Sequence, residues 1–196
     1  MSSGGYDLNP VRALLAVLVL VCVGCGSSAP DGPTVSGSNP PPPAKAGEVD
    51  VERKAFALVE EQFGEILEDL AQAREQIVIA KKAVPSSGRD SIDVVIDLVD
   101  AAAGRVADLN NDLPTDETWK TFKTKLAATK KQWVNDLNDS LFEVAEAKRA
   151  VESLGDFASD ERKVPYSMAG SSFADASTGL EVAIEALGGT VEQVDP

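Results

Sequence analysis

FALVEEQFGEILEDLAQAREQIVIAKKAV, residues 56–84, has a prominent apolar residue at alternating steps of three and four. These residues are Phe56, Val59, Phe63, Ile66, Leu70, Ala73, Ile77, Ala80 and Val84. Such spacing places one apolar seam along an α-helix, and Pro85 ends that helix. At 1.5 Å per residue, a helix over 48–84 is roughly 55 Å long. Because a seam of this length must be covered by other helices, the segment predicts an all-α protein.

Three further helices are predicted downstream. The second follows a turn at Ser86–Gly88, the third begins with Thr115 as N-cap and runs to about Leu154, and the fourth starts at Tyr166 or Met168 after a loop. Gly188 and Gly189 stop the fourth helix. The seam residues are Ile92, Val95, Val99, Ala102, Val106, Leu109 and Leu113 in the second helix, Trp119, Phe122, Leu126, Trp133, Leu137, Leu141, Val144, Ala147 and Val151 in the third, and Phe173, Ala176, Leu180, Ala183 and Leu187 in the fourth.

We expect these helices to form an antiparallel up-down-up-down four-helix bundle with coiled-coil-like long helices. The regular spacing is lost in the third helix, where Asn135–Ser140 are mediocre helix formers, so a bend or local loosening is expected there. In the fourth helix, Gly170–Ser172 and Gly179 weaken the helix but let a neighbour approach closely. The bundle is predicted to span 48–188, followed by a frayed tail over 189–196.

The N-terminal segment has a different character. Ala13–Val23 is an apolar run of 11 residues, which is shorter than the roughly 20 needed to cross a bilayer as a helix but fits the core of a secretory signal. Gly24 and Cys25 follow it. The arrangement resembles the bacterial lipoprotein signal peptide, and the resemblance covers residues 1–25 only. An ordinary cleaved signal and an uncleaved anchor are the alternatives.

The resemblance implies cleavage after residue 24 and a lipid on Cys25, which would hold the protein on a membrane. It further implies a location in the bacterial cell envelope, facing the periplasm or the exterior, and the outer membrane in a Gram-negative cell. Residues 25–47 are rich in Gly, Ser, Pro and Ala and include Pro40–Pro43. This composition predicts a disordered linker between the anchor and the bundle.

Charge and composition exclude several classes of function. The chain carries a net charge of -14, which argues against nucleic acid as a partner. It has no His, and after cleavage Cys25 would be its only Cys. A thiol nucleophile, a His base and a thiolate or imidazole metal site are therefore excluded from the mature domain. We expect no enzyme activity, no cofactor and no metal.

Two groups of polar residues could in principle form a metal or catalytic site. Asp108, Asn110 and Asp112 have the spacing that opens a calcium-binding EF-hand loop, but Leu113 and Trp119 stand where the loop needs Gly and Glu. A helix stop explains them better. The second group could pair as general acid and base, although a solvated acidic surface is the simpler interpretation. Its members are Glu61, Glu65, Glu68, Glu143 and Glu146.

A basic stretch stands out in this acidic chain. No acid occurs between Thr118 and Asn135, and the stretch contains two Trp residues and five lysines: Lys120, Lys123, Lys125, Lys130 and Lys131. It could contact anionic lipid head groups or an acidic wall polymer. The simpler interpretation buries the aromatic residues in the core and pairs the lysines with the acidic first helix.

The sequence leaves three hypotheses for function. The first is a non-enzymatic envelope lipoprotein that presents a helical bundle on a flexible tether for contact with an envelope protein or the wall. The second is a module that binds a small ligand in a cavity of roughly 300 Å³ or more, either near Asn135–Ser140 or at the small residues of the last helix. The third is a hydrolase that works with carboxylates alone and contains buried acidic pairs.

Overall fold

A computed structural model of the chain describes residues 46–86, 89–156 and 158–192. All of these belong to the second of two units into which the chain divides, Pro43–Pro196. The predicted signal peptide over 1–24, Cys25 and the linker up to residue 45 lie outside the described residues. Residues 193–196 of the predicted tail also lie outside them.

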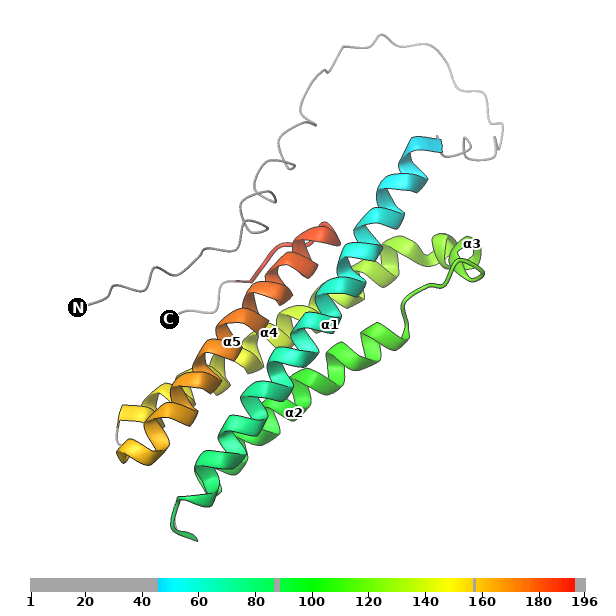
Figure 1. Ribbon diagram of the computed structural model, residues 1–196. Coiled ribbons are helices and arrows are strands. Elements are labelled where there is room, and N and C mark those ends of the chain that lie inside the picture. The colour runs from blue at the N-terminus through cyan, green and yellow to red at the C-terminus, as the bar shows by residue number, and fades with distance from the viewer. Residues whose placement is uncertain (1–45, 87–88, 157, 193–196) are drawn as a thin grey trace, which may run out of the picture. The chain divides into compact units, whose positions relative to one another are not determined.

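All regular structure in the described part is helical, which confirms the predicted all-α class. The elements are α1 (Ala46–Lys82), α2 (Arg89–Asn111), α3 (Trp119–Phe122), the 3-10 turn η4 (Lys123–Lys125), α4 (Leu126–Asp156) and α5 (Asp160–Ala186). The four long helices lie side by side, and α3 lies at one end of them (Figure 1). Helices α1 and α4 each pack against both α2 and α5, and the contact between α1 and α5 is the most extensive. The arrangement is bundle-like.

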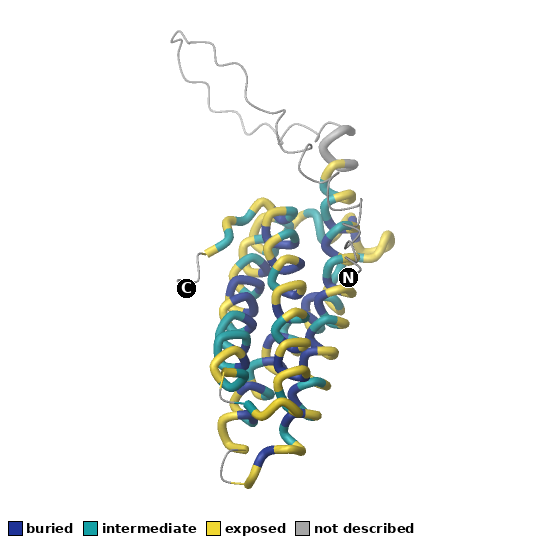
Figure 2. Tube along the Cα trace, turned by 60° about the vertical axis from the view of Figure 1, so that its left-hand side comes forward, coloured by how far each residue is buried: buried dark blue, intermediate teal, exposed yellow. Residues whose placement is uncertain are grey.

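The predicted seams form the core. Every seam residue of α1, from Phe56 to Val84, is buried. Those of α2, α4 and α5 are buried as well, except that Leu113, Phe122 and Leu126 are partly exposed. Together they make one continuous cluster. Figure 2 shows the buried positions on the faces that the helices turn toward one another, with exposed positions outside. Burial of apolar surface is thus the force that holds the four helices together.

Helices α1 and α5 approach closely at Gly179. A Cβ atom at this position would lie 2.7 Å from Cγ1 of Ile66, closer than side chains tolerate. Gly170, on the same helix, has no neighbour within 4 Å of the corresponding point. The predicted close approach is therefore confirmed at Gly179, and it was wrong for Gly170.

The third predicted helix is interrupted, but not where the sequence analysis placed the irregularity. The α-helical pattern breaks at Lys123–Lys125, whereas Asn135–Ser140 lie in unbroken α-helix. The polar side chains of Asn138 and Ser140 are buried and donate hydrogen bonds to carbonyl groups four residues earlier, at 3.0 Å in each case. Because the helix itself satisfies these groups, they need not loosen it.

Helix α5 also starts earlier than predicted, at Asp160 rather than at Tyr166 or Met168. Ser159 has an extended backbone and precedes the helix, and the acidic side chains of Asp160 and Glu161 lie in the first turn, where the helix dipole favours negative charge. Pro165 lies inside the helix and is buried. A proline this close to the start removes one backbone hydrogen bond, and burial against the core compensates for it.

The C-terminal end of α5 stops at a glycine, as predicted. Gly188 has φ +76°, its N–H donates to Glu185, and the N–H of Gly189 donates to the carbonyl of Ile184. This is the hydrogen-bond pattern of a Schellman motif. Beyond it, Nδ2 of Asn138 donates to the carbonyl of Thr190 at 3.2 Å, and its Oδ1 accepts from the N–H of Glu192 at 2.9 Å. Asn138 therefore fixes the described part of the tail to α4.

Candidate functional site

An aromatic cluster joins the first half of α1 to α3 and α4. The ring of Phe56 packs edge-on against Trp119, Phe122 and Trp133, with centroids 5.5, 5.3 and 5.7 Å away. Trp119 and Trp133 are buried. The two Trp residues of the basic stretch thus belong to the core, which agrees with the simpler of the two interpretations for these aromatic residues.

The loop before α3 is closed by two threonines. The N–H of Thr115 donates to the hydroxyl of Thr118 at 2.9 Å, and the N–H of Thr118 donates back to the hydroxyl of Thr115 at 3.3 Å. This reciprocal pair resembles a capping box, but it closes the turn that precedes the helix. The helix begins at Trp119 with Thr118 as its N-cap, so the prediction of Thr115 as N-cap was wrong. The closed turn leaves Trp119 anchored at the start of α3. The indole N–H of Trp119 is buried and has no hydrogen-bond partner among the described residues.

One of the five lysines is held by α1. Nζ of Lys130 lies 3.4 Å from Oε1 of Glu52 and 5.8 Å from the centroid of the Phe56 ring. For the other four, no ion pair is found within the described ranges. Lys120, Lys125 and Lys131 are exposed, and Lys123 is half-buried. The predicted pairing with the acidic first helix therefore holds for Lys130 alone. We call Lys120, Lys123, Lys125 and Lys131 the basic end.

The charge of this region contrasts with the rest of the molecule. Residues 119–134 carry +5, which leaves -19 on the remainder of a chain whose total is -14. Arg53 pairs with Asp116 at 3.3 Å and lies over the Trp119 ring at 5.6 Å, so the nearby acids Glu52 and Asp116 each already have a cation. The basic end therefore stays available to an anionic partner.

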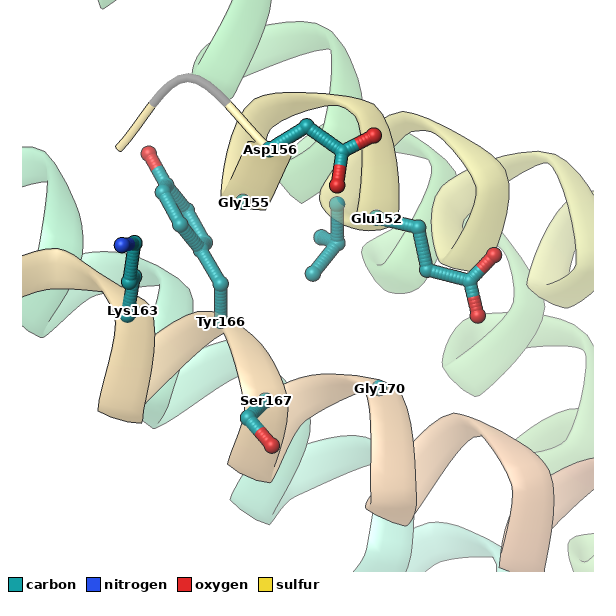
Figure 3. Close-up of a pocket in the computed structure, with 8 residues that line it drawn as sticks. Glu152, Gly155, Asp156, Lys163, Tyr166, Ser167 and Gly170 are labelled. Carbon is teal, nitrogen blue, oxygen red and sulfur yellow. The ribbon is translucent and has the colours of Figure 1, made fainter.

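A second candidate is a surface pocket between the end of α4 and the start of α5 (Figure 3). Its volume is about 350 Å³, which reaches the size expected of a small-ligand site. It lies at the small residues of the last helix, one of the two places that the ligand hypothesis named. The lining residues are Val151, Glu152, Gly155, Asp156, Lys163, Tyr166, Ser167 and Gly170.

Tyr166 is the chemically unusual residue of this pocket. Its ring rises from α5 beside Lys163 toward the end of α4 (Figure 3). Only 3% of the residue is exposed, and its buried hydroxyl has no hydrogen-bond partner in the part of the chain that the structure describes. Burial raises the pKa of Tyr166, and the neighbouring Arg162 opposes this in part. The seam pattern gave no sign of this position, because the sequence analysis placed it at the helix start.

Four of the five glutamates considered as a catalytic or metal site have separate partners. Glu143 forms two hydrogen bonds of 2.8 Å with the guanidinium of Arg105, and Glu146 lies 2.6 Å from Arg149. Glu65 and Glu68 bond to glutamines on their own helix, Gln62 and Gln72. The backbone N–H of Asp112 donates to the backbone carbonyl of Asp108 at the C-terminal end of α2. Within 46–86, 89–156 and 158–192, no three acidic, His or Cys side chains gather as a metal site.

One partly buried carboxylate, that of Asp136, has a raised pKa. Burial and the nearby charge of Asp139 raise the pKa of Asp136, and the guanidinium of Arg105 lowers it in part. Arg105 is itself held by Glu143, and this side-chain hydrogen bond raises the pKa of the guanidinium. Asp136 and Asp139 lie one turn apart on α4, so their repulsion follows from sequence spacing. The pair lies apart from the pocket lining.

None of the helices in the described part is both long enough and apolar enough to span a membrane. No family model, no curated protein and no solved structure matches this chain.

Proposed function

We propose that this protein is a non-enzymatic lipoprotein of the bacterial cell envelope, which presents a helical bundle on a flexible tether for contact with other envelope components. The observation that carries the proposal is the apolar run Ala13–Val23 followed by Gly24 and Cys25. A membrane anchor at Cys25 would leave residues 26–45 as a spacer before α1, whose first residue is Ala46.

The packing of the helices supports this role. A protein that acts by surface contact should have a filled core and a charged surface region. The four seams form one core, and the basic end lies at or near the surface. Four of the five glutamates considered for catalysis bond to different partners. A contact surface on a rigid body fits these features better than a reaction centre does.

We infer that the bundle has up-down-up-down topology with coiled-coil-like pairing of its long helices. Two features support this. The links after α1 and α4 are short, which favours antiparallel neighbours, and α1 packs against both α2 and α5. The unbroken three-and-four spacing of the α1 seam is the pattern of a coiled-coil face.

Detergent phase partition tests the anchor. The full chain is expressed in a bacterium beside two single variants, Cys25→Ser and Cys22→Ser. We expect wild type and Cys22→Ser in the detergent phase and Cys25→Ser in the aqueous phase, because only Cys25 would carry lipid. Mass spectrometry of the wild type should give a mature N-terminus at residue 25 with added acyl mass. Equal partition of all three proteins, or a mature chain with an unmodified sulfur, contradicts the proposal.

The pocket favours one alternative function, a module that binds a small ligand. Its volume of about 350 Å³ and its mixture of Glu152, Asp156 and Lys163 beside the Tyr166 ring would suit a small polar molecule with an apolar part. Titration with small amines and carboxylates, monitored through the amide resonances of Gly155 and Ser167, tests it. Saturable shifts in wild type that disappear in Gly170→Phe, which would fill the pocket, would favour this function over contact alone.

A further inference from the structure

The basic end lies at the end of the molecule where the N-terminal segment joins the bundle. Near the start of α1, Glu52 pairs with Lys130, and Arg53 pairs with Asp116. Phe56, only one turn later, packs on Trp119 and Phe122. Helix α1 begins at Ala46, so its N-terminal end lies at the same end of the described bundle as α3 and η4. A lipid anchor on the preceding segment would therefore be tethered to this end of the bundle.

The anchoring of α3 and η4 keeps their lysines outside. Trp119 and Phe122 turn toward Phe56, and these rings fix the segment to α1 and α4. The lysines between and after them face solvent or are half-buried. A 3-10 turn within an otherwise α-helical run often marks a functional site or strain, and here it lies among the lysines themselves.

Charge determines the kind of partner. The basic end is the part of this acidic chain that an anionic surface would attract, and the -19 on the rest would be repelled from the same surface. The molecule would therefore be oriented as well as attracted. Each lysine near an anionic bilayer strengthens binding about fivefold. Four lysines alone give a weak attachment, but a tether raises the effective concentration into the range where weak contacts are occupied.

We propose that the basic end, Lys120, Lys123, Lys125 and Lys131, docks on the anionic lipid head groups of the membrane to which the tether is attached. This inference rests on the proposed lipid anchor.

Lysine labelling on vesicles tests the docking. Full-length lipidated protein is reconstituted into vesicles of neutral phosphatidylcholine and into vesicles that also contain phosphatidylglycerol, and lysines are acylated and mapped by mass spectrometry. We expect labelling of Lys120, Lys125 and Lys131 to fall severalfold on the anionic vesicles, and high salt to restore it. Lys82 and Lys163, which are exposed elsewhere, serve as internal controls and should be labelled equally on both.

Charge-removal variants complete the test. Replacing Lys120, Lys123, Lys125 and Lys131 together by Gln should abolish the slowing of amide hydrogen exchange that anionic vesicles cause over 119–131. A matched variant with Lys82, Lys148 and Lys163 changed to Gln should retain that slowing. Circular dichroism confirms that both variants stay folded, which is expected because the replaced side chains lie at or near the surface.

The outcomes separate the docking from the anchor. Protein that binds neither vesicle overturns the anchor and the docking together. Protein that binds both vesicles with equal lysine labelling leaves the anchor standing and overturns the docking. Protection that appears only when an acidic wall polymer is added overturns docking on lipid in favour of the wall.

Discussion

The hydroxyl of Tyr166 is the clearest single-atom anomaly in the core. It is buried without a hydrogen-bond partner in the described part of the chain, although the ring packs well. A buried polar group without a partner keeps its desolvation cost and gains nothing in return. The phenol is thus tolerated for the packing of its ring, or for a partner that binds at the pocket.

Tyr166→Phe should therefore stabilise the protein by about 1 kcal/mol, because it removes only the unpaired oxygen. Urea unfolding measures the change, and Tyr166→Ala serves as the comparison, since loss of the ring should cost about 3–5 kcal/mol. If Tyr166→Phe loses stability, the hydroxyl has a partner in solution, and Arg162 is the nearest candidate.

Asp136 predicts a pH dependence of stability. Its pKa is raised in the folded state by burial and by Asp139, so the folded chain binds this proton more tightly than the unfolded chain. At a pH below the ordinary aspartate pKa of about 3.8, the raised folded-state pKa of Asp136 stabilises the folded protein. This contribution is lost as the pH rises through the folded-state pKa. Asp136→Asn should be more stable than wild type at neutral pH.

Thermal unfolding at a series of pH values measures this difference. The advantage of Asp136→Asn should shrink as the solution becomes more acidic and vanish once wild-type Asp136 is protonated in both states. An advantage that stays constant across the series would attribute the effect to packing of the amide and not to titration of the carboxylate.

Asn138 illustrates which residue roles the sequence could not reveal. The residue was interpreted as a weak helix former and a reason for loosening at Asn135–Ser140. In the structure its amide bonds to the carbonyls of Val134 and Thr190 and accepts from Glu192. Two of these partners are more than fifty residues away in sequence, and no local pattern encodes them. Propensity alone therefore placed the irregularity in the middle of the predicted helix, whereas the break lies nearer its start, at Lys123–Lys125.

At the scale of elements, the contact between α1 and α5 depends on a missing side chain. Gly179→Ala would place a Cβ atom 2.7 Å from Cγ1 of Ile66, a methylene that is close to the backbone and cannot swing away. We expect a loss of about 1–3 kcal/mol from overpacking, which outweighs the gain of about 1 kcal/mol that Ala brings to a helix.

Gly170→Ala is the matched control on the same helix, because nothing lies within 4 Å of its Cβ position. It should gain up to about 1 kcal/mol from helix propensity alone. Urea unfolding should show a lower free energy of unfolding for Gly179→Ala and a higher one for Gly170→Ala. Equal effects of the two substitutions would contradict the close approach of α1 and α5 at Gly179.

The helices themselves were predictable to different degrees. Every predicted seam residue from Phe56 to Val84 is buried. A long, regular apolar period predicts burial of one helix face regardless of which neighbouring helices cover it. The predicted start of α5, Tyr166 or Met168, lies after Pro165, whereas the helix begins at Asp160 and contains Pro165 as a buried residue. The basic end was located from charge alone, but only the contacts of Phe56 placed it beside the start of α1.

At the scale of the whole molecule, the described part of the chain contains a continuous core. Among the described residues, the buried apolar side chains run from Phe56 to Leu187. A helical unit of this size can bury enough apolar surface to fold without a disulfide or a metal. The helical unit thus has a core of its own within the described residues.

A fragment of residues 46–196 should accordingly fold on its own. We expect strongly helical circular dichroism and a single cooperative thermal transition, with a midpoint within about 2 °C of the full chain in detergent. A fragment of residues 60–196 is the contrasting case, because it lacks Phe56 and thus the ring on which Trp119 and Trp133 pack. It should unfold at a clearly lower temperature, and hydrogen exchange over 119–131 should be fast. If the longer fragment is largely unfolded, residues 1–45 must contribute to the core, and a separate tether is then impossible.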